Sequence, residues 1–309
     1  MSSKDDVKRF IHCKEIIFDN GNTSVEYYYK PNSEILFITF DSVNIKKEDE
    51  PFGLRFLRTL DVDILAFRKR KKHGYASDFL YEMFNEVVKD IHPKYKRKIA
   101  YGFSLGAYAT LYYASRIDSE IFAIAPRIPA HPIYGTKVKN KVSFNHDLHL
   151  KFNDKIKPVI AYDPYNKIDD KYFKNEIITN FPNLNLIKSN YAGHKVAQHY
   201  VQMNVLKQMV LSIYNGEEIT YDKKLRVNSV QYLSILSQVC LNKKKYKWAS
   251  DIADKALNID SNDKRANLVK YTIELEKTKC NLKKALSHAK TIGIDASELF
   301  MELNDLIHN

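Results

Sequence analysis

A serine flanked by two glycines constrains the fold of this chain more than any other feature. Residues 102–106 read Gly-Phe-Ser-Leu-Gly, between an apolar run at Lys98–Tyr101 and a helix-forming run at Ala107–Arg116. Glycines two positions before and after a serine are needed where a strand turns into a helix so sharply that side chains there would collide with backbone. The pattern therefore predicts a strained turn at Ser104, with its hydroxyl lifted clear of a sheet and above a helix N-terminus.

Short apolar runs that favour strands alternate with amphipathic runs that favour helices over residues 20–215. The predicted strands are Ser24–Tyr29, Ile35–Phe40, Val62–Phe67, Ile99–Phe103, Ile121–Ala125, Val159–Tyr162 and Leu184–Lys188. The predicted helices are Ser77–Ile91, Leu105–Arg116, Lys171–Asn180 and Val196–Tyr214. This alternation is typical of a mostly parallel sheet flanked by helices. The sequence therefore predicts the α/β class, with an antiparallel strand added at the N-terminal side.

The order of these elements, the glycine-flanked Ser104 and the pair Gly193–His194 after the last predicted strand together resemble the α/β-hydrolase superfamily. In that superfamily the serine is a nucleophile, and a histidine further along the chain accepts its proton. The resemblance implies these roles for Ser104 and His194, with His199, inside a predicted helix, as the alternative base. It also implies that residues 126–157 form the cap or substrate-binding insertion of an α/β-hydrolase fold.

An acidic residue is expected to orient the histidine and to stabilise its protonated form. Open α/β sheets place their sites at the carboxyl ends of strands, and Asp163 directly follows the predicted strand Val159–Tyr162. Asp169 and Asp170 are competitors a few residues later. If Asp163 instead caps the turn that follows it, Asp169 becomes the acid. The sequence favours Asp163.

Two backbone N–H groups are expected to stabilise the oxyanion that forms during acyl transfer. The residue after the nucleophile, Leu105, is expected to supply one of them. The other is expected from Asp41 or Ser42, which follow the predicted strand Ile35–Phe40. This position has no HGGG-type motif, which argues against the lipase and carboxylesterase branches of the superfamily.

Two residues beyond the predicted strand Ile121–Ala125 are candidates for substrate contact. Arg127 is expected to bind an anionic group of the substrate, and His131 is expected to contact the substrate from the insertion. The histidines of the insertion lack the spacing of metal ligands, so no metal site is predicted.

Strand signals stop after Glu217, and the rest of the chain reads as consecutive helices. The positions that match the spacing of a tetratricopeptide repeat are Leu233, Leu236, Ser237, Cys240, Tyr246, Ala249, Ala253, Ala256, Leu257 and Asp260. The segment that follows, to Asp295, is read as a second, degenerate copy, and a plain helical appendage is the alternative. We therefore expect a hydrolase-like domain over residues 1–220 and a small all-α domain over residues 221–309, which could bind a partner protein.

The chain carries a formal net charge of +12, and basic residues cluster at 68–72 and 94–98. Such charge favours an anionic partner, such as a glycan, a nucleotide-linked donor or a membrane surface. The alternative is a composition that is rich in lysine throughout. No nucleic-acid-binding motif accompanies the charge, so a nucleic acid partner is not expected.

The three cysteines are widely separated and odd in number, which favours free thiols in a reducing compartment over a disulfide framework or a zinc site. The polar N-terminal residues do not resemble a signal peptide. No apolar run approaches the roughly 18–20 residues that span a bilayer. The expected location is the cytoplasm, with peripheral association as the expected form of any membrane contact.

These observations predict a serine-dependent hydrolase of acyl esters that works through an acyl-enzyme and needs no cofactor. An alternative is suggested by the segments 38–42, 125–126, 193–194 and 199–200, which resemble the α/β-hydrolase-type O-acetyltransferases of bacterial capsular and surface glycans. That resemblance implies acetyl-CoA as the donor and an anionic glycan as the acceptor. A non-catalytic scaffold with a hydrolase fold is the third alternative.

Overall fold

The computed structural model describes residues 12–46, 48–70, 75, 79–135, 143–146, 155–295, 297 and 301. The chain forms two compact units, residues 1–232 and residues 233–309. Residues 221–232 belong to the first unit, where the ring centroid of Tyr221 lies 5.2 Å from that of Tyr200. The boundary expected between residues 220 and 221 stays a prediction.

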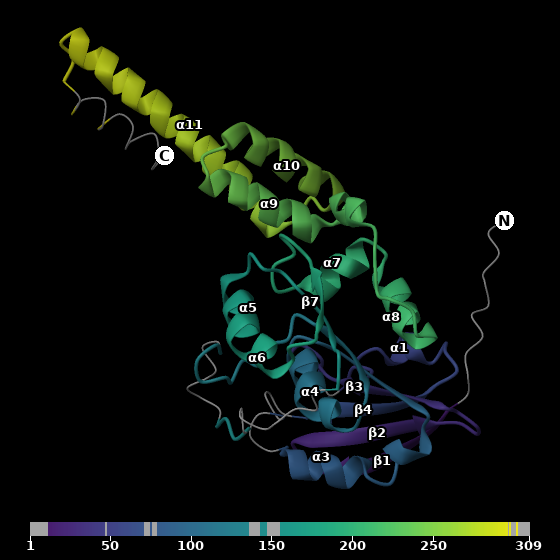
Figure 1. The fold of residues 1–309 in the computed structure, drawn as a ribbon. Coiled ribbons are helices and arrows are strands. Elements are labelled where there is room, and N and C mark those ends of the chain that lie inside the picture. Colours follow the sequence, from purple (N-terminus) through teal and green to yellow (C-terminus); the bar gives the residue numbers. More distant parts are fainter. Residues whose placement is uncertain are drawn as a thin grey trace, which may run out of the picture. The chain divides into compact units, whose positions relative to one another are not determined.

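The first unit is built on one sheet of eight strands (Figure 1). The strands are β1 (Cys13–Asp19), β2 (Thr23–Tyr29), β3 (Ile35–Phe40), β4 (Asp63–Lys69), β5 (Arg97–Phe103), β6 (Glu120–Ile124), β7 (Val159–Tyr162) and β8 (Asn185–Lys188). Their order is β1-β2-β4-β3-β5-β6-β7-β8. Strands β3 to β8 are parallel, whereas β1 and β2 are antiparallel to their neighbours. This is the α/β-hydrolase fold, and it confirms the predicted α/β class.

The helices of the first unit largely follow the amphipathic runs of the sequence. They are α1 (Leu54–Leu57), α3 (Tyr81–Val88), α4 (Leu105–Tyr113), α5 (Lys167–Tyr172), α6 (Ile178–Asn180), α7 (Val196–Gln202) and α8 (Leu206–Asn215). The helix expected over Lys171–Asn180 begins earlier, at Lys167, and has a π-helical turn at Phe173–Ile177. The helix expected over Val196–Tyr214 is divided into α7 and α8, because Asn204 between them adopts a φ of 59°, in the left-handed region.

Two expectations fall partly outside the described residues. The expected start of a helix at Ser77 lies outside them, and so do residues 136–142 and 147–154 of the expected insertion at 126–157. The described residues of that insertion form turns and irregular backbone. Its role as a cap or substrate-binding segment stays a prediction.

Side chains of the central strands alternate between two separate cores. Leu36 of β3 lies in one core with Phe84 of α3 and with residues of α4. The next residue, Phe37, lies in the other core with Met209 of α8 and with residues of α7. Because successive side chains of a strand point to opposite faces, the sheet is buried on both sides. Helices α3 and α4 cover one face, and α7 and α8 cover the other (Figure 1).

The second unit contains most of α9 (Val230–Asn242) together with α10 (Tyr246–Ile259) and α11 (Lys264–Thr291). Helix α10 buries three alanines, Ala249, Ala253 and Ala256. Residues 264–291 contain no glycine or proline and form one continuous helix. The expected second copy of a tetratricopeptide repeat is therefore wrong, because a repeat needs two helices and a turn. The first copy stays a prediction.

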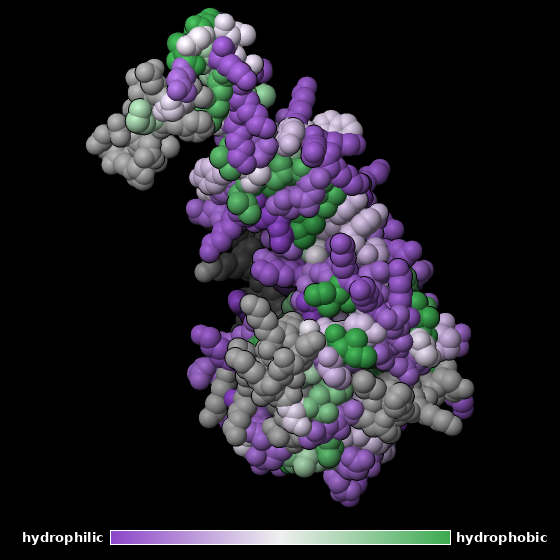
Figure 2. Space-filling model, turned by 90° about the vertical axis from the view of Figure 1, so that its left-hand side faces the viewer, coloured by the Kyte–Doolittle hydropathy of each residue, from purple (hydrophilic) through white to green (hydrophobic). Residues whose placement is uncertain are grey.

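Within the described residues, no helix combines the length and the apolar character needed to cross a membrane. On the face shown in Figure 2, hydrophilic residues predominate and hydrophobic ones lie among them in small groups.

Three buried histidines make the stability of the first unit sensitive to acid. The ring of His199 in α7 is 1% exposed, and its Nδ1 donates to Ser229 Oγ at 2.8 Å, since that hydroxyl itself donates to Gln202 Oε1. Burial lowers the pKa of His199 to about 4. Burial also lowers the pKa values of His131 and His146 to about 4. All three side chains are therefore neutral in the folded protein near pH 7.

Lowering the pH from 7 to 5 is expected to reduce the free energy of unfolding. A histidine whose folded-state pKa lies below its ordinary value of 6.5 favours the folded state above that pH, and this contribution is lost as the pH falls towards 4. Urea denaturation at pH 7 and pH 5 measures the effect. His199→Gln, which cannot titrate, is expected to lose roughly 2 kcal/mol less than wild type between these pH values. An equal loss in both proteins would contradict the assignment.

Candidate active site

The turn from β5 into α4 has the strained geometry that the sequence predicts. Ser104 adopts φ 54° and ψ −115° at the N-cap of α4. A Cβ added at Gly106 would lie 2.2 Å from the carbonyl oxygen of Phe40, and one added at Gly102 would lie 2.5 Å from the carbonyl oxygen of Gly106. Backbone contacts this close leave room for glycine alone at both positions. The turn therefore depends on both glycines, and it places Ser104 at the carboxyl end of a central strand.

His194 lies within hydrogen-bond reach of Ser104. The distance from Ser104 Oγ to His194 Nε2 is 2.8 Å. His194 follows β8 in a loop where Tyr191 and Gly193 both have positive φ, so the backbone reverses sharply before α7. The expected alternative, His199, is buried in α7 beside Ser229. The structure thus brings together the serine and the histidine that the sequence favours.

The acid beside His194 is Asp169, not Asp163. Asp169 Oδ2 lies 3.0 Å from His194 Nδ1, and its side chain is 2% exposed in the first turn of α5. The carboxylate of Asp163 instead accepts hydrogen bonds from the N–H groups of Tyr165, at 2.9 Å, and Gly193, at 2.7 Å. The favoured prediction of a contact between Asp163 and His194 is therefore wrong. Asp163 instead caps the turn between β7 and α5 and links this turn to the loop that carries His194.

Burial raises the pKa of Asp163, and the N–H groups of Tyr165 and Gly193 oppose this by stabilising the ionised carboxylate. Asp170, the third acidic candidate, accepts from Tyr162 Oη and pairs with Lys174 on the surface of α5. Only one of the three carboxylates therefore faces the histidine.

Arg127 contacts the acid rather than open space. Its Nε donates to Asp169 Oδ1 at 2.7 Å, and its Nη2 also pairs with that carboxylate and donates to Asn166 Oδ1 at 3.3 Å. The backbone N–H of Arg127 donates to the carbonyl of Ser104 at 3.1 Å. This arrangement differs from the expected contact with an anionic substrate group. It places the positive charge of Arg127 against the buried carboxylate of Asp169, and the ion pair offsets the free-energy cost of burying the negative charge.

Asp41 is not available as an oxyanion donor. Its N–H donates to the carbonyl of Phe67 at 3.0 Å and to Tyr75 Oη at 3.1 Å. Its carboxylate accepts from Arg68 Nε at 2.8 Å and from the N–H of Phe52 at 3.1 Å. Burial raises the pKa of Asp41, and the Arg68 guanidinium opposes that shift. The expectation that Asp41 binds the oxyanion is therefore corrected, because Asp41 ties its loop to β4.

Ser42 and Leu105 are left as the donor pair. In the described part of the chain, the N–H of Ser42 makes no hydrogen bond to protein. Leu105 is the first residue of α4, so its N–H precedes the internal hydrogen bonds of that helix. The close approach of Gly106 to Phe40 brings the loop after β3 against this helix N-terminus. Their role as an oxyanion hole stays a prediction.

His131 is buried rather than open to solvent. Its Nδ1 accepts from the N–H groups of Ile133 and Tyr134, both at 3.1 Å, so that in the neutral ring Nε2 carries the hydrogen. This Nε2 has no hydrogen-bond partner among the residues that the structure describes. The side chain packs beside Tyr172 of α5, one turn from Asp169. Contact between His131 and substrate stays a prediction.

Two residues that support the site, Arg68 and Asn166, were not identified from the sequence. Arg68 begins a basic run, yet it is 6% exposed and its Nη2 donates to the carbonyls of Lys46 and Asp49, which fixes the loop that contains Ser42. Asn166 caps α5 and contacts Arg127. An asparagine ahead of a helix is a known capping signal, but a buried arginine in a basic run gives no such signal.

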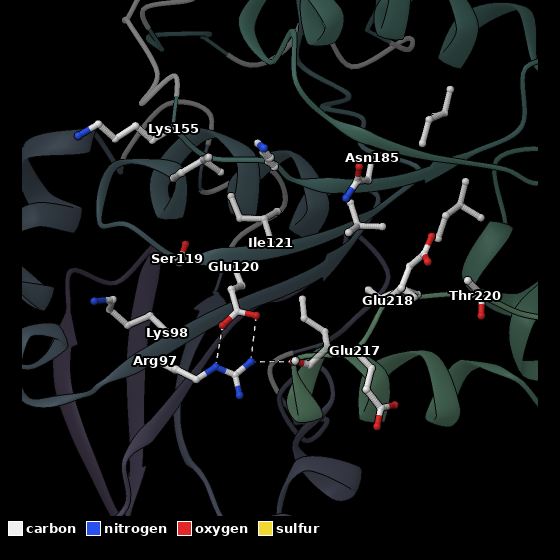
Figure 3. Close-up of a pocket in the computed structure, with 18 of the residues that line it drawn as sticks. Arg97, Lys98, Ser119, Glu120, Ile121, Lys155, Asn185, Glu217, Glu218 and Thr220 are labelled. Atoms are coloured by element: carbon white, nitrogen blue, oxygen red, sulfur yellow. Dashed lines mark hydrogen bonds and ion pairs between the residues drawn. The ribbon is translucent and has the colours of Figure 1, made fainter.

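A cleft of about 890 Å³ lies elsewhere, at the amino ends of β5 to β8. Its lining residues include Arg97 and Glu120, which form an ion pair, and Lys98 and Lys155, which lie on the left in Figure 3. Ser104 lies at the carboxyl end of β5, so this cleft is at the opposite edge of the sheet from the site. Among the described residues, no group of three or more histidine, cysteine, aspartate or glutamate side chains could hold a metal ion.

No protein-family model and no curated protein sequence matches the chain. Solved structures with a similar fold include an esterase of Pyrococcus furiosus, with 15% identity and a TM-score of 0.46, which covers 70% of this chain and 94% of its own. The mouse α/β hydrolase domain-containing protein 10 has 11% identity and a TM-score of 0.44, over 66% of this chain and 99% of its own. The capsule O-acetyltransferase of Neisseria meningitidis serogroup A has 18% identity and a TM-score of 0.37, and the match covers 62% of this chain and 92% of the transferase chain.

Proposed function

We propose that the protein is a serine-dependent hydrolase of acyl esters in which Ser104, His194 and Asp169 form the catalytic triad. The observation that carries the proposal is the continuous chain of contacts from Ser104 Oγ to His194 Nε2, at 2.8 Å, and from His194 Nδ1 to Asp169 Oδ2, at 3.0 Å. These are the distances and the order of groups that a histidine needs to accept a proton from a serine and to be held in the correct tautomer.

In the proposed reaction Ser104 Oγ attacks the carbonyl carbon of the ester while His194 Nε2 accepts the hydroxyl proton. The oxyanion is stabilised by the N–H groups of Leu105 and Ser42, helped by the N-terminus of α4. The tetrahedral intermediate then breaks its bond to the alkoxide, which takes the proton from His194 and leaves as an alcohol. A water molecule, deprotonated by His194, attacks the acyl-enzyme and releases the acid and the free serine.

Transfer of the acyl group to a glycan hydroxyl is the second candidate. With acetyl-CoA as the donor, formation of the acyl-enzyme breaks the thioester and His194 gives its proton to the departing thiol of CoA. A sugar hydroxyl then replaces water as the group that attacks the acyl-enzyme. The sequence resemblance at residues 38–42, 125–126, 193–194 and 199–200 to surface-glycan O-acetyltransferases favours it, with acetyl-CoA as the donor and an anionic glycan as the acceptor.

The fate of the acyl-enzyme separates the two candidates. The purified protein is incubated with p-nitrophenyl acetate, and separately with acetyl-CoA, with and without a panel of anionic bacterial glycans. Steady release of p-nitrophenol that does not depend on glycan is expected for the hydrolase. Release of CoA that requires glycan would support the transferase instead. A folded protein that reacts with neither donor would contradict both.

A further inference from the structure

Two tyrosines stack on each other beside the proposed triad. The ring centroids of Tyr165 and Tyr191 are 4.4 Å apart, with an angle of 11° between the ring planes. Tyr165 is 58% exposed, although Tyr191 covers one of its faces. The opposite face of the Tyr165 ring is therefore open to solvent. Stacking on Tyr191 fixes the orientation of this exposed ring, which distinguishes it from an aromatic side chain that is exposed singly.

One tyrosine lies in the turn that leads into α5, the helix that carries the acid, and the other lies in the loop that carries the base. Tyr165 precedes Asp169 in the turn between β7 and α5, and Tyr191 precedes His194 in the loop after β8. Asp163 joins these loops, since its carboxylate accepts the N–H of Tyr165 and the N–H of Gly193. The pair is therefore tied, through Asp163, to the loop that carries His194 at the carboxyl edge of the sheet.

The platform is preorganised rather than formed on binding. Tyr191 is held by a left-handed backbone, with φ 63°, and by the edge of Tyr232, whose ring centroid lies 6.3 Å away. The next residue, Ala192, is fully buried, and its carbonyl accepts from Gln231 Nε2 at 3.0 Å. Because these side chains are already ordered, a ligand that stacks on Tyr165 loses little free energy to ordering them.

We propose that Tyr165, supported by Tyr191, is a binding platform for a pyranose ring of the substrate. A sugar ring has a flat face of C–H groups and a rim of hydroxyls, so it matches an exposed aromatic face bordered by polar phenol groups. The proposal rests on the proposed acyl-ester chemistry and adds the class of substrate, namely esters carried by a glycan. Small esters that fill only the space at Ser104 would not reach the platform.

Binding is measured in the Ser104→Ala background, so that the result does not depend on turnover. The probes are O-acetylated cellohexaose, xylohexaose and mannohexaose, studied by calorimetry. Adding Tyr165→Ala is expected to weaken binding about tenfold for at least one probe, which corresponds to loss of one aromatic stacking contact. Tyr165→Phe and Tyr165→Trp, which keep an aromatic face, are expected to retain most of the affinity. Tyr271→Ala, at a tyrosine that is 70% exposed in α11, is the matched control.

Equal effects of Tyr165→Ala and Tyr271→Ala, or failure of all three probes to bind, would overturn the platform. Wild type and Tyr271→Ala, both with Ser104 intact, are tested in parallel with p-nitrophenyl acetate, and equal turnover is expected because Tyr271 lies in α11, outside the site. If wild type does not turn over this ester, the proposed hydrolase activity is contradicted. Calorimetry in the Ser104→Ala background still shows whether Tyr165 contributes to binding of the glycan probes. The two failures are therefore distinguishable.

Discussion

Replacing Ser104 with alanine is expected to lower kcat/KM for p-nitrophenyl acetate by at least about 10⁴-fold. The hydroxyl is the only group of the triad that bonds to the acyl carbon, so its loss removes the acyl-enzyme altogether. The side chain is small and, among the described residues, its Oγ makes a hydrogen bond to His194, so little packing is lost. Initial-rate kinetics, together with an unfolding curve for each protein, measure the two effects separately.

The matched control is Ser115→Ala, at a buried serine just beyond the end of α4 whose Oγ donates to the carbonyl of Leu111. This variant is expected to keep its activity. A fluorophosphonate probe, which reacts with activated serines, is expected to label wild type and Ser115→Ala but not Ser104→Ala. Labelling that persists in Ser104→Ala would mean that another serine is the nucleophile. Absence of labelling in all three proteins would favour the scaffold interpretation.

The nucleophile turn could be predicted from the sequence because its determinants are local. Gly102 and Gly106 lie within two residues of Ser104, and the strand and helix on either side are short-range patterns. The alternation of apolar runs likewise predicted the central strands β3 to β6, since strands that are buried on both faces are largely apolar. Strand β1 was not predicted, because its residues are mostly exposed and show no such pattern.

The acid could not be chosen from the sequence, because the choice depends on contacts between distant loops. Asp163 stands directly at the end of β7, the position that the general rule for α/β sheets favours. The N–H of Gly193, 30 residues away, occupies its carboxylate, and the first turn of α5 carries Asp169 to the histidine instead. Asp41 failed as an oxyanion donor for the same reason, since Phe67 and Tyr75 take up its N–H.

Replacing Asp169 with asparagine is expected to reduce kcat by about 10⁴-fold, because the amide can no longer hold His194 in the tautomer that accepts a proton at Nε2. The matched control is Asp170→Asn, next to it on the same helix, which is expected to stay within about threefold of wild type because its carboxylate faces Tyr162 and Lys174. Asp163→Asn is expected to act mainly on stability. The single oxygen of the amide cannot replace both carboxylate oxygens as acceptors for the partly buried N–H groups of Tyr165 and Gly193, so the free energy of unfolding should fall by about 1 kcal/mol.

Asp169→Asn also leaves the guanidinium of Arg127 without its ion pair, so lost activity must be separated from lost stability. The double variant Arg127→Gln/Asp169→Asn removes both charges and is expected to recover part of the stability while staying inactive. Urea denaturation measures the free energy of unfolding of each variant, and initial-rate kinetics on the same samples measure kcat. Recovery of activity in the double variant, or a greater loss of kcat in Asp163→Asn than in Asp169→Asn, would show that Asp169 is not the acid of the triad. A stable but inactive double variant would leave the contact between Asp169 and His194 as the feature on which catalysis depends.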